Sequence, residues 1–156
     1  MSNRHIEPPV RPPNLFLGAL IAGCVLELLF PLGPGLAGGN LRAIFIGLGI
    51  AVIGIGIAWK AVVQFTDAGT SVPLDEPTDA LVTDGLYNWS RNPIYIGLCV
   101  LYVGLSIALT TVWALLLLPL IIIFLRRTVI EREEALLIAE YGDEYQTYKT
   151  RVPRWL

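Results

Sequence analysis

The chain has 156 residues, of which 54% are apolar and only 15% are charged, an apolar share well above that of a typical soluble domain. The net charge of −2 and the lack of a basic tract give no support to nucleic-acid binding. Composition therefore predicts a single membrane domain.

Two apolar segments occupy the N-terminal part of the chain. Residues 1–13 are expected to form a proline-rich arm, disordered or lying on the surface. A cleavable signal peptide is not expected, because the next apolar run is too long and lacks a small-residue cleavage site. That run, residues 14–32, and a second at residues 41–59 predict two transmembrane helices within residues 14–64, joined by a Gly/Pro-rich turn.

The second segment carries small residues at spacings of four, three and four, which allow close helix packing in lipid. They are Gly47, Ala51, Gly54 and Ala58. Glu27, in the first segment, is expected to pair with Arg42 at the start of the second. Cys24 and Cys99 lie in apolar segments and are expected to pack, and no spacing predicts a metal site.

A polar loop over residues 65–92 precedes an uncharged run of 33 residues, 93–125. One helix of that length would extend about 50 Å, which is too long for the membrane's hydrocarbon core of about 30 Å. We therefore expect a hairpin over residues 93–130 that turns near residues 110–113, with Asn92 as N-cap and Pro93 at the first helical position. The predicted fold is an all-α integral membrane protein with four transmembrane helices in two hairpins.

The last segment, residues 131–156, is predicted to be an amphipathic helix at the membrane interface, broken or kinked at Gly142. Residues at three- and four-residue spacings form a stripe along one face of this helix: Glu134, Leu137, Ile138, Tyr141, Tyr145 and Tyr148. With four spans, ten of the eleven basic residues fall on one side and Arg42 alone on the other. The positive-inside rule then places both termini and the central loop in the cytoplasm, as in a bacterial-type inner-membrane protein.

Two polar clusters border the hairpin, and each has two interpretations. Arg127 and Glu131 are four residues apart on a helix, with Glu134 nearby; they form either a salt bridge that ends the span or a charged wall facing the bundle interior. The segment around Tyr87 and Asn92 is either a capped helix start with interfacial aromatics or part of a ligand site.

The same two clusters resemble the isoprenylcysteine carboxyl methyltransferase and phospholipid methyltransferase superfamily over roughly residues 66–156. The first motif reads Leu81-Val82-Thr83-x-Gly85-x-Tyr87-x-x-x-Arg91-Asn92-Pro93-x-Tyr95-x-Gly97. The second reads Glu133-Glu134-x-x-Leu137, then Tyr141-Gly142-x-Glu144-Tyr145-x-x-Tyr148-x-x-Arg151-Val152-Pro153. Asn92 stands where eukaryotic members typically have histidine; an amide cannot titrate, which weakens the isoprenylcysteine inference but leaves the cofactor inference intact.

The resemblance implies methyl transfer from S-adenosylmethionine to a hydrophobic or lipid-like acceptor at the cytoplasmic membrane face. The residues it implies for cofactor binding are Leu81, Val82, Gly85, Tyr87, Asn92, Pro93, Tyr95, Glu133 and Glu134. Arg127 and Glu131 match a pair assigned to acceptor handling, with Arg127 holding an anionic acceptor and Glu131 orienting it or accepting a proton.

Two other classes compete with a methyltransferase. Sterol reductases share the superfamily's fold and bind a nicotinamide cofactor, but they are longer than this chain. A non-enzymatic membrane protein or small transporter should show charge near the membrane midplane and often an internal repeat. Only Glu27 lies near the expected midplane, and residues 1–64 show no sequence similarity to residues 93–156.

Overall fold

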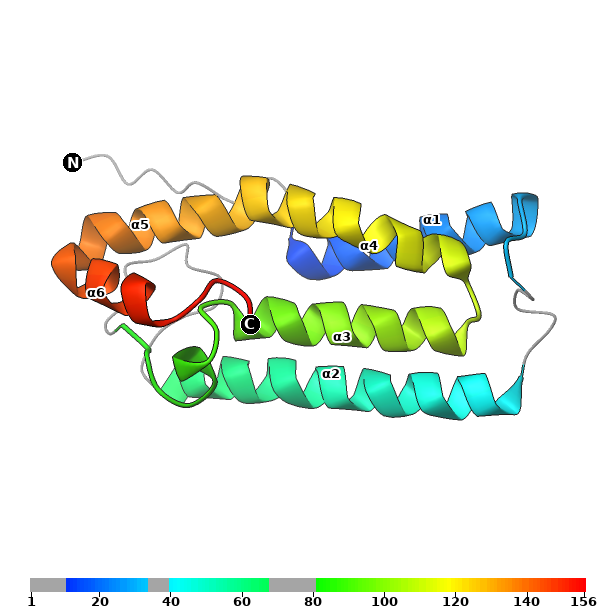
Figure 1. Ribbon diagram of the computed structural model, residues 1–156, viewed down its shortest axis with the longest axis horizontal. Helices are drawn as coiled ribbons and strands as arrows, with labels where there is room; N and C mark the ends of the chain where they lie inside the picture. Colours follow the sequence, from blue (N-terminus) through cyan, green and yellow to red (C-terminus); the bar gives the residue numbers. More distant parts are fainter. Residues whose placement is uncertain (1–10, 34–39, 68–80) are drawn as a thin grey trace.

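The computed structural model describes residues 11–33, 40–67 and 81–156, where all regular secondary structure is helical. The elements are α1 (Pro12–Leu29), α2 (Leu41–Asp67), the 3-10 helix η2 (Gly85–Asn88), α3 (Pro93–Ala108), α4 (Val112–Leu125), the π-helical turn η3 (Arg126–Ile130), α5 (Glu131–Tyr141) and α6 (Asp143–Arg151). Helices α1 to α4 lie side by side and run roughly along the long axis of the molecule, and α5 and α6 lie at one end (Figure 1). Most of the predicted arm and residues 68–80 of the central loop lie outside the described residues.

Three helices in the described chain are long and apolar enough to cross a membrane: α1, α2 and the continuous helix Val112–Tyr141. The second helix runs eight residues beyond the predicted 41–59. Helix α3 is also apolar but has only 16 residues, fewer than the roughly 20 that cross a hydrocarbon core. Large apolar side chains such as Leu17, Phe45 and Val52 point outwards, as expected of helices in contact with lipid. The protein is therefore an integral membrane protein, and the count of four spans stays a prediction.

The predicted hairpin turn is confirmed. Helix α3 ends at Ala108 and α4 begins at Val112, with Thr111 as N-cap accepting a hydrogen bond from the Ala114 amide at 3.5 Å. The second arm is longer than the first, because α4 continues through η3 into α5 without a break.

Helices α2 and α3 pack backbone to backbone through their small residues. A Cβ atom added at Gly54 would meet the Leu101 amide nitrogen and lie 2.8 Å from the Gly97 carbonyl oxygen. One added at Gly104 would meet the Ala51 amide nitrogen. The predicted packing face on α2 is thus confirmed, and its partner is α3. Because glycine and alanine let the two backbones approach each other, α2 fixes the position of α3 closely.

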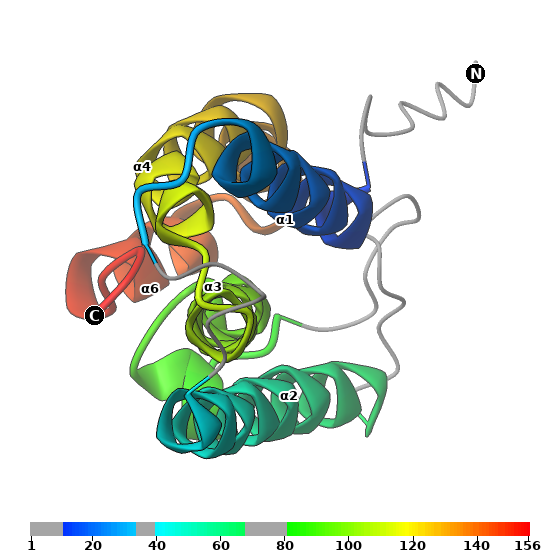
Figure 2. The same cartoon turned by 90° about the vertical axis from the view of Figure 1, so that its right-hand side faces the viewer.

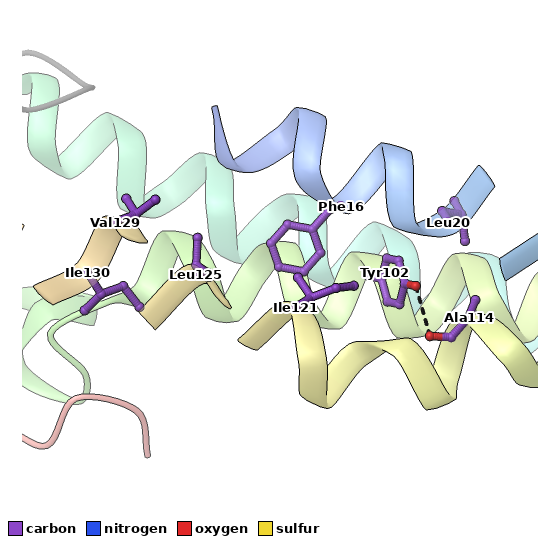
Figure 3. Close-up of a cluster of buried hydrophobic side chains, with 8 residues drawn as sticks. All are labelled: Phe16, Leu20, Tyr102, Ala114, Ile121, Leu125, Val129 and Ile130. Carbon is purple, nitrogen blue, oxygen red and sulfur yellow. Dashed lines mark hydrogen bonds between the residues drawn. The ribbon is translucent and has the colours of Figure 1, made fainter. Parts of the chain in front are cut away.

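The other side of α3 packs against α1 and α4 through a buried apolar cluster (Figure 3). Phe16 of α1 meets the Tyr102 ring edge-on, with centroids 5.8 Å apart. The Tyr102 hydroxyl donates to the Ala114 carbonyl of α4 at 2.9 Å, which satisfies the buried polar tip of the ring. Cys24 and Cys99 are both free thiols, and Cys99 packs against this cluster.

The expected pairing of Glu27 with Arg42 is wrong. The buried Glu27 carboxylate instead accepts backbone N–H groups from the α1 C-terminal turn and the α4 N-terminus. Leu32 and Gly33 donate at 2.7 Å each and Val112 at 2.9 Å. Amides at a helix N-terminus lack carbonyl partners within the helix, and the Glu27 carboxylate accepts their hydrogen bonds. Glu27 therefore joins α1 to α4 at the end of the bundle opposite α6.

The predicted break at Gly142 is confirmed, with φ at +51° separating α5 from α6. Helix α6 folds back at the end of the bundle, and the C-terminus lies near the start of α3 (Figure 1). Tyr145, Tyr148 and Val152 form a small buried cluster against Leu137. The predicted stripe is thus divided between two helices that face each other.

Candidate functional site

The segment before α3 is attached to the end of α2. Gly85 adopts φ +60°, and its α-carbon lies so close to the Gln64 side chain that a Cβ atom would overlap it. Gln64 accepts the Leu86 amide at 3.1 Å, and the Tyr87 hydroxyl donates to the Ala61 carbonyl at 3.4 Å. Glycine suits this position because other residues rarely adopt the left-handed conformation, and a Cβ atom would also displace the end of the Gln64 side chain. The turn places Tyr87 in the interior, 5% exposed.

The C-terminal tail closes behind the same segment. The Arg91 amide donates to the Pro153 carbonyl, and the side chains of Ser90 and Asn92 both donate to the Arg154 carbonyl, each at 3.0 Å. Asn92 is the N-cap residue of α3, as predicted, but its side chain makes no capping hydrogen bond. The Asn92 amide group therefore holds the tail in place.

Glu134 is the centre of a buried ionic network. It accepts Arg91 Nη1 at 2.8 Å and two Arg154 nitrogens at 2.8 and 2.7 Å. The side chains of Arg91 and Glu134 are only 9% and 8% exposed. The hydrogen bond to Glu134 raises the pKa of Arg154. The network joins the segment before α3, helix α5 and the tail, three parts of the chain that are far apart in sequence.

The π-helical turn η3 decides which acidic side chains face inwards. The Glu131 amide donates to the Arg126 carbonyl, five residues back, so the turn contains one extra residue. As a result Glu131 pairs with Arg126 at 3.1 Å on the surface, and not with Arg127 four residues back. Arg127 and Glu131 are both exposed, whereas Glu134 is buried and Glu133 accepts the Tyr95 hydroxyl at 2.7 Å.

These side chains border a cavity of about 890 Å³. Arg11 and Asn14 line it from the start of α1. Its main polar part comes from α3, the segment before it, α5 and α6, and consists of Tyr87, Arg91, Asn92, Tyr95, Glu133, Glu134, Tyr145 and Tyr148. Its apolar part consists mainly of Ile55, Ala58, Trp59, Val62, Leu98 and Leu101. A volume of this size suits a cofactor or a drug-sized ligand.

Eight of the nine side chains predicted to bind the cofactor line this one cavity: Leu81, Val82, Tyr87, Asn92, Pro93, Tyr95, Glu133 and Glu134. The ninth residue, Gly85, lies outside the lining and shapes the turn instead. Arg127 and Glu131, predicted to handle the acceptor, also lie outside it.

Buried tyrosines keep their protons at this site. Burial raises the pKa of Tyr148, whose hydroxyl donates to the Tyr87 carbonyl at 2.6 Å. Burial also raises the pKa of Tyr87, and the nearby Tyr148 and Glu133 add to the shift. Both hydroxyls therefore remain neutral donors across the physiological range.

Sequence reasoning gave no ligand-binding role to three arginines of the cavity or the ionic network. Arg91 lies inside the first motif and was the easiest of the three to identify from the sequence. Arg154 pairs with a residue 20 positions away across the break at Gly142, which no helical spacing indicates. Arg11 lines the cavity from the start of α1, outside both motifs.

Comparison with known proteins identifies the family to which the chain belongs. Residues 42–144 of the 156 match the family model for phospholipid methyltransferases, and the chain belongs to that family. No solved structure matches the chain significantly.

The curated relatives are named protein-S-isoprenylcysteine O-methyltransferases. The chain is 41% identical to the Homo sapiens protein over 51% of this chain and 28% of the human one. It is 34% identical to the Rattus norvegicus protein over 69% of this chain and 39% of the rat one. It is 36% identical to the Schizosaccharomyces pombe protein over 47% of this chain and 31% of the yeast one. The chain thus matches well under half the length of these relatives.

Proposed function

We propose that this protein is a membrane methyltransferase that moves the methyl group of S-adenosylmethionine to a hydrophobic or lipid-like acceptor at the cytoplasmic face. The observation that carries the proposal is that eight of the nine residues implied for cofactor binding line one cavity, polar at one end and apolar at the other. Family membership supports the reaction class. A polar cofactor can reach the polar end from water, and an apolar acceptor the other end from lipid.

The side chains at the polar end suit S-adenosylmethionine, which supplies an electrophilic methyl group on a sulfonium. Glu133 brings a carboxylate to the cofactor's cationic groups. Arg91 borders the same space, and its buried Nε has no hydrogen-bond partner among the described residues, which leaves one donor for an anionic group. The rings of Tyr87 and Phe65, 5.4 Å apart, offer a surface for adenine.

Glu134 has a different role from Glu133 in this proposal. Its two oxygens already accept three hydrogen bonds from arginines. It therefore orients Arg91 and does not bind the cofactor directly. Tyr95 holds Glu133 in the same way, through its hydroxyl.

Methyl transfer is an in-line displacement, in which an acceptor lone pair forms the new bond to carbon as the bond to sulfur breaks. The protein contributes alignment and a water-poor environment. The buried tyrosines and the tail behind Asn92 close the polar end, while α2 and α3 provide an apolar wall for the acceptor.

The acceptor-handling role of Arg127 and Glu131 stays a prediction. If it holds, Arg127→Ala and Glu131→Ala will each reduce turnover with a physiological acceptor by at least about tenfold. Their exposed side chains favour the opposite result. Wild-type turnover in both variants would exclude the role.

The activity itself is tested by incubating membranes that contain the protein with methyl-labelled S-adenosylmethionine. We expect label in a lipid extract, in prenylated protein or in a volatile fraction, and the fraction identifies the acceptor class. Membranes with the Glu133→Gln variant are the control and should transfer much less label. Equal labelling by membranes with and without the protein would contradict the proposal.

A further inference from the structure

Arg11 is the charged residue of the cavity lining that neither the family match nor the sequence motifs account for. It is the N-cap residue of α1 and is exposed, and Pro12, Pro13 and Asn14 beside it also line the cavity. Helix α1 lies outside residues 42–144, the region that matches the family model. This edge of the cavity is therefore supplied by a part of the chain that the family model does not cover.

Arg11 differs from the other cation in the cavity lining. Arg91 is buried and forms an ion pair with Glu134. Arg11 forms no ion pair with any residue in 11–33, 40–67 or 81–156. The positive end of the α1 dipole lies at the same place and adds to the attraction for an anion. Among the described residues, the rim of the cavity thus carries a positive charge that no carboxylate pairs with.

Arg11 lies beside the apolar part of the cavity. Helices α1 and α2 are on separate sides of the bundle, with α3 between them (Figures 1 and 2). The lining comes from the α1 N-terminus, from α2 residues such as Trp59 and from α3 residues such as Leu98. A ligand in this part would lay a hydrocarbon chain along α2 and α3 and place a polar group near Arg11.

We propose that Arg11 is a specificity-determining residue that binds the anionic group, carboxylate or phosphate, of an amphiphilic acceptor held along α2 and α3 beside the N-terminus of α1. This rests on the proposed function and assigns to Arg11 the anion-binding role that sequence analysis gave to Arg127. Arg127 is exposed and lies outside the cavity lining, whereas Arg11 is part of it.

A charge-assisted hydrogen bond at an exposed rim should be worth about a tenfold change in affinity, and less at high salt. Arg11→Gln is therefore expected to weaken binding of an anionic amphiphile about tenfold at low ionic strength, and its neutral analogue by less than about twofold. Arg11→Lys should retain most of the affinity. Arg42→Gln, an exposed arginine at the far end of α2, is the matched control and should bind as wild type does.

The test measures binding to the full chain in phosphatidylcholine nanodiscs. N-acetyl-S-farnesylcysteine and its neutral methyl amide form one pair of probes, and oleoyl lysophosphatidate and monoolein form the other. A charge-selective loss in the first pair alone identifies a carboxylate, and one in the second alone identifies a phosphate; either supports the proposal.

Equal weakening of an anionic probe and its neutral analogue would overturn the proposal, because it would indicate a packing role. No weakening of either anionic probe would overturn it as well. S-adenosylhomocysteine binding is measured in the same samples. If wild-type protein fails to bind it, the proposed function fails, while the comparison between charged and neutral probes still decides the role of Arg11.

Discussion

Glu134→Gln is expected to lower the free energy of unfolding by about 3–5 kcal/mol and to weaken S-adenosylhomocysteine binding by at least about 30-fold. The variant keeps the size of the side chain but leaves Arg91 and Arg154 without their common anion. Arg91 is 9% exposed, so water cannot replace the lost partner. Arg91 lines the cavity and Arg154 fixes the tail. Loss of the Glu134 charge should therefore weaken both cofactor binding and the stability of the fold. Thermal unfolding in detergent and calorimetric titration measure the two effects.

Glu144→Gln is the matched control for this prediction. Glu144 is exposed on α6, and removing an exposed charge changes stability by at most about 0.5 kcal/mol. A Glu134→Gln protein as stable as Glu144→Gln, with unchanged S-adenosylhomocysteine affinity, would show that the network neither stabilises the fold nor positions Arg91.

Gly54→Ala should have the second large effect, a loss of about 1–3 kcal/mol or more. The added Cβ atom would collide with backbone atoms of α3, including the Gly97 carbonyl at 2.8 Å, and backbone cannot move aside as a flexible side chain can. Helix α2 must therefore shift away from α3. Since Ala58 and Trp59 on α2 line the cavity, turnover should fall along with the unfolding temperature.

Gly56→Ala provides the matched control two residues along the same helix. A Cβ atom at Gly56 would meet nothing within 4 Å, so this variant should be neutral or slightly stabilised. The difference between the two variants isolates helix contact from helix propensity. Equal unfolding temperatures for both would contradict the close packing of α2 and α3.

The sequence was sufficient for features that depend on composition and short spacing. The apolar runs, the turn near Thr111, the break at Gly142 and the small-residue face of α2 each have a local physical cause. The candidate cofactor site was implied by the family resemblance, which rests on two motifs that keep their order along the chain. Eight of the nine implied residues then proved to line one cavity.

The features that escaped prediction depend on contacts between distant residues or on a change of helical register. The π turn at residues 126–130 changes the pairing of Glu131 from Arg127 to Arg126, and a four-residue spacing rule assumes a regular α-helix. The Glu27 carboxylate accepts backbone amides, which have no signature in side-chain sequence. The contact of Asn92 with the Arg154 carbonyl spans 62 residues.

The central claim is that the cavity between the end of α2, the start of α3 and helix α5 binds S-adenosylmethionine. The most direct measurement is calorimetric titration of the wild-type protein in nanodiscs with S-adenosylhomocysteine, alongside a reduced nicotinamide nucleotide. We expect saturable one-site binding of S-adenosylhomocysteine, its loss in Glu134→Gln, and no binding of the nicotinamide nucleotide. Folded wild-type protein that binds no S-adenosylhomocysteine would contradict it.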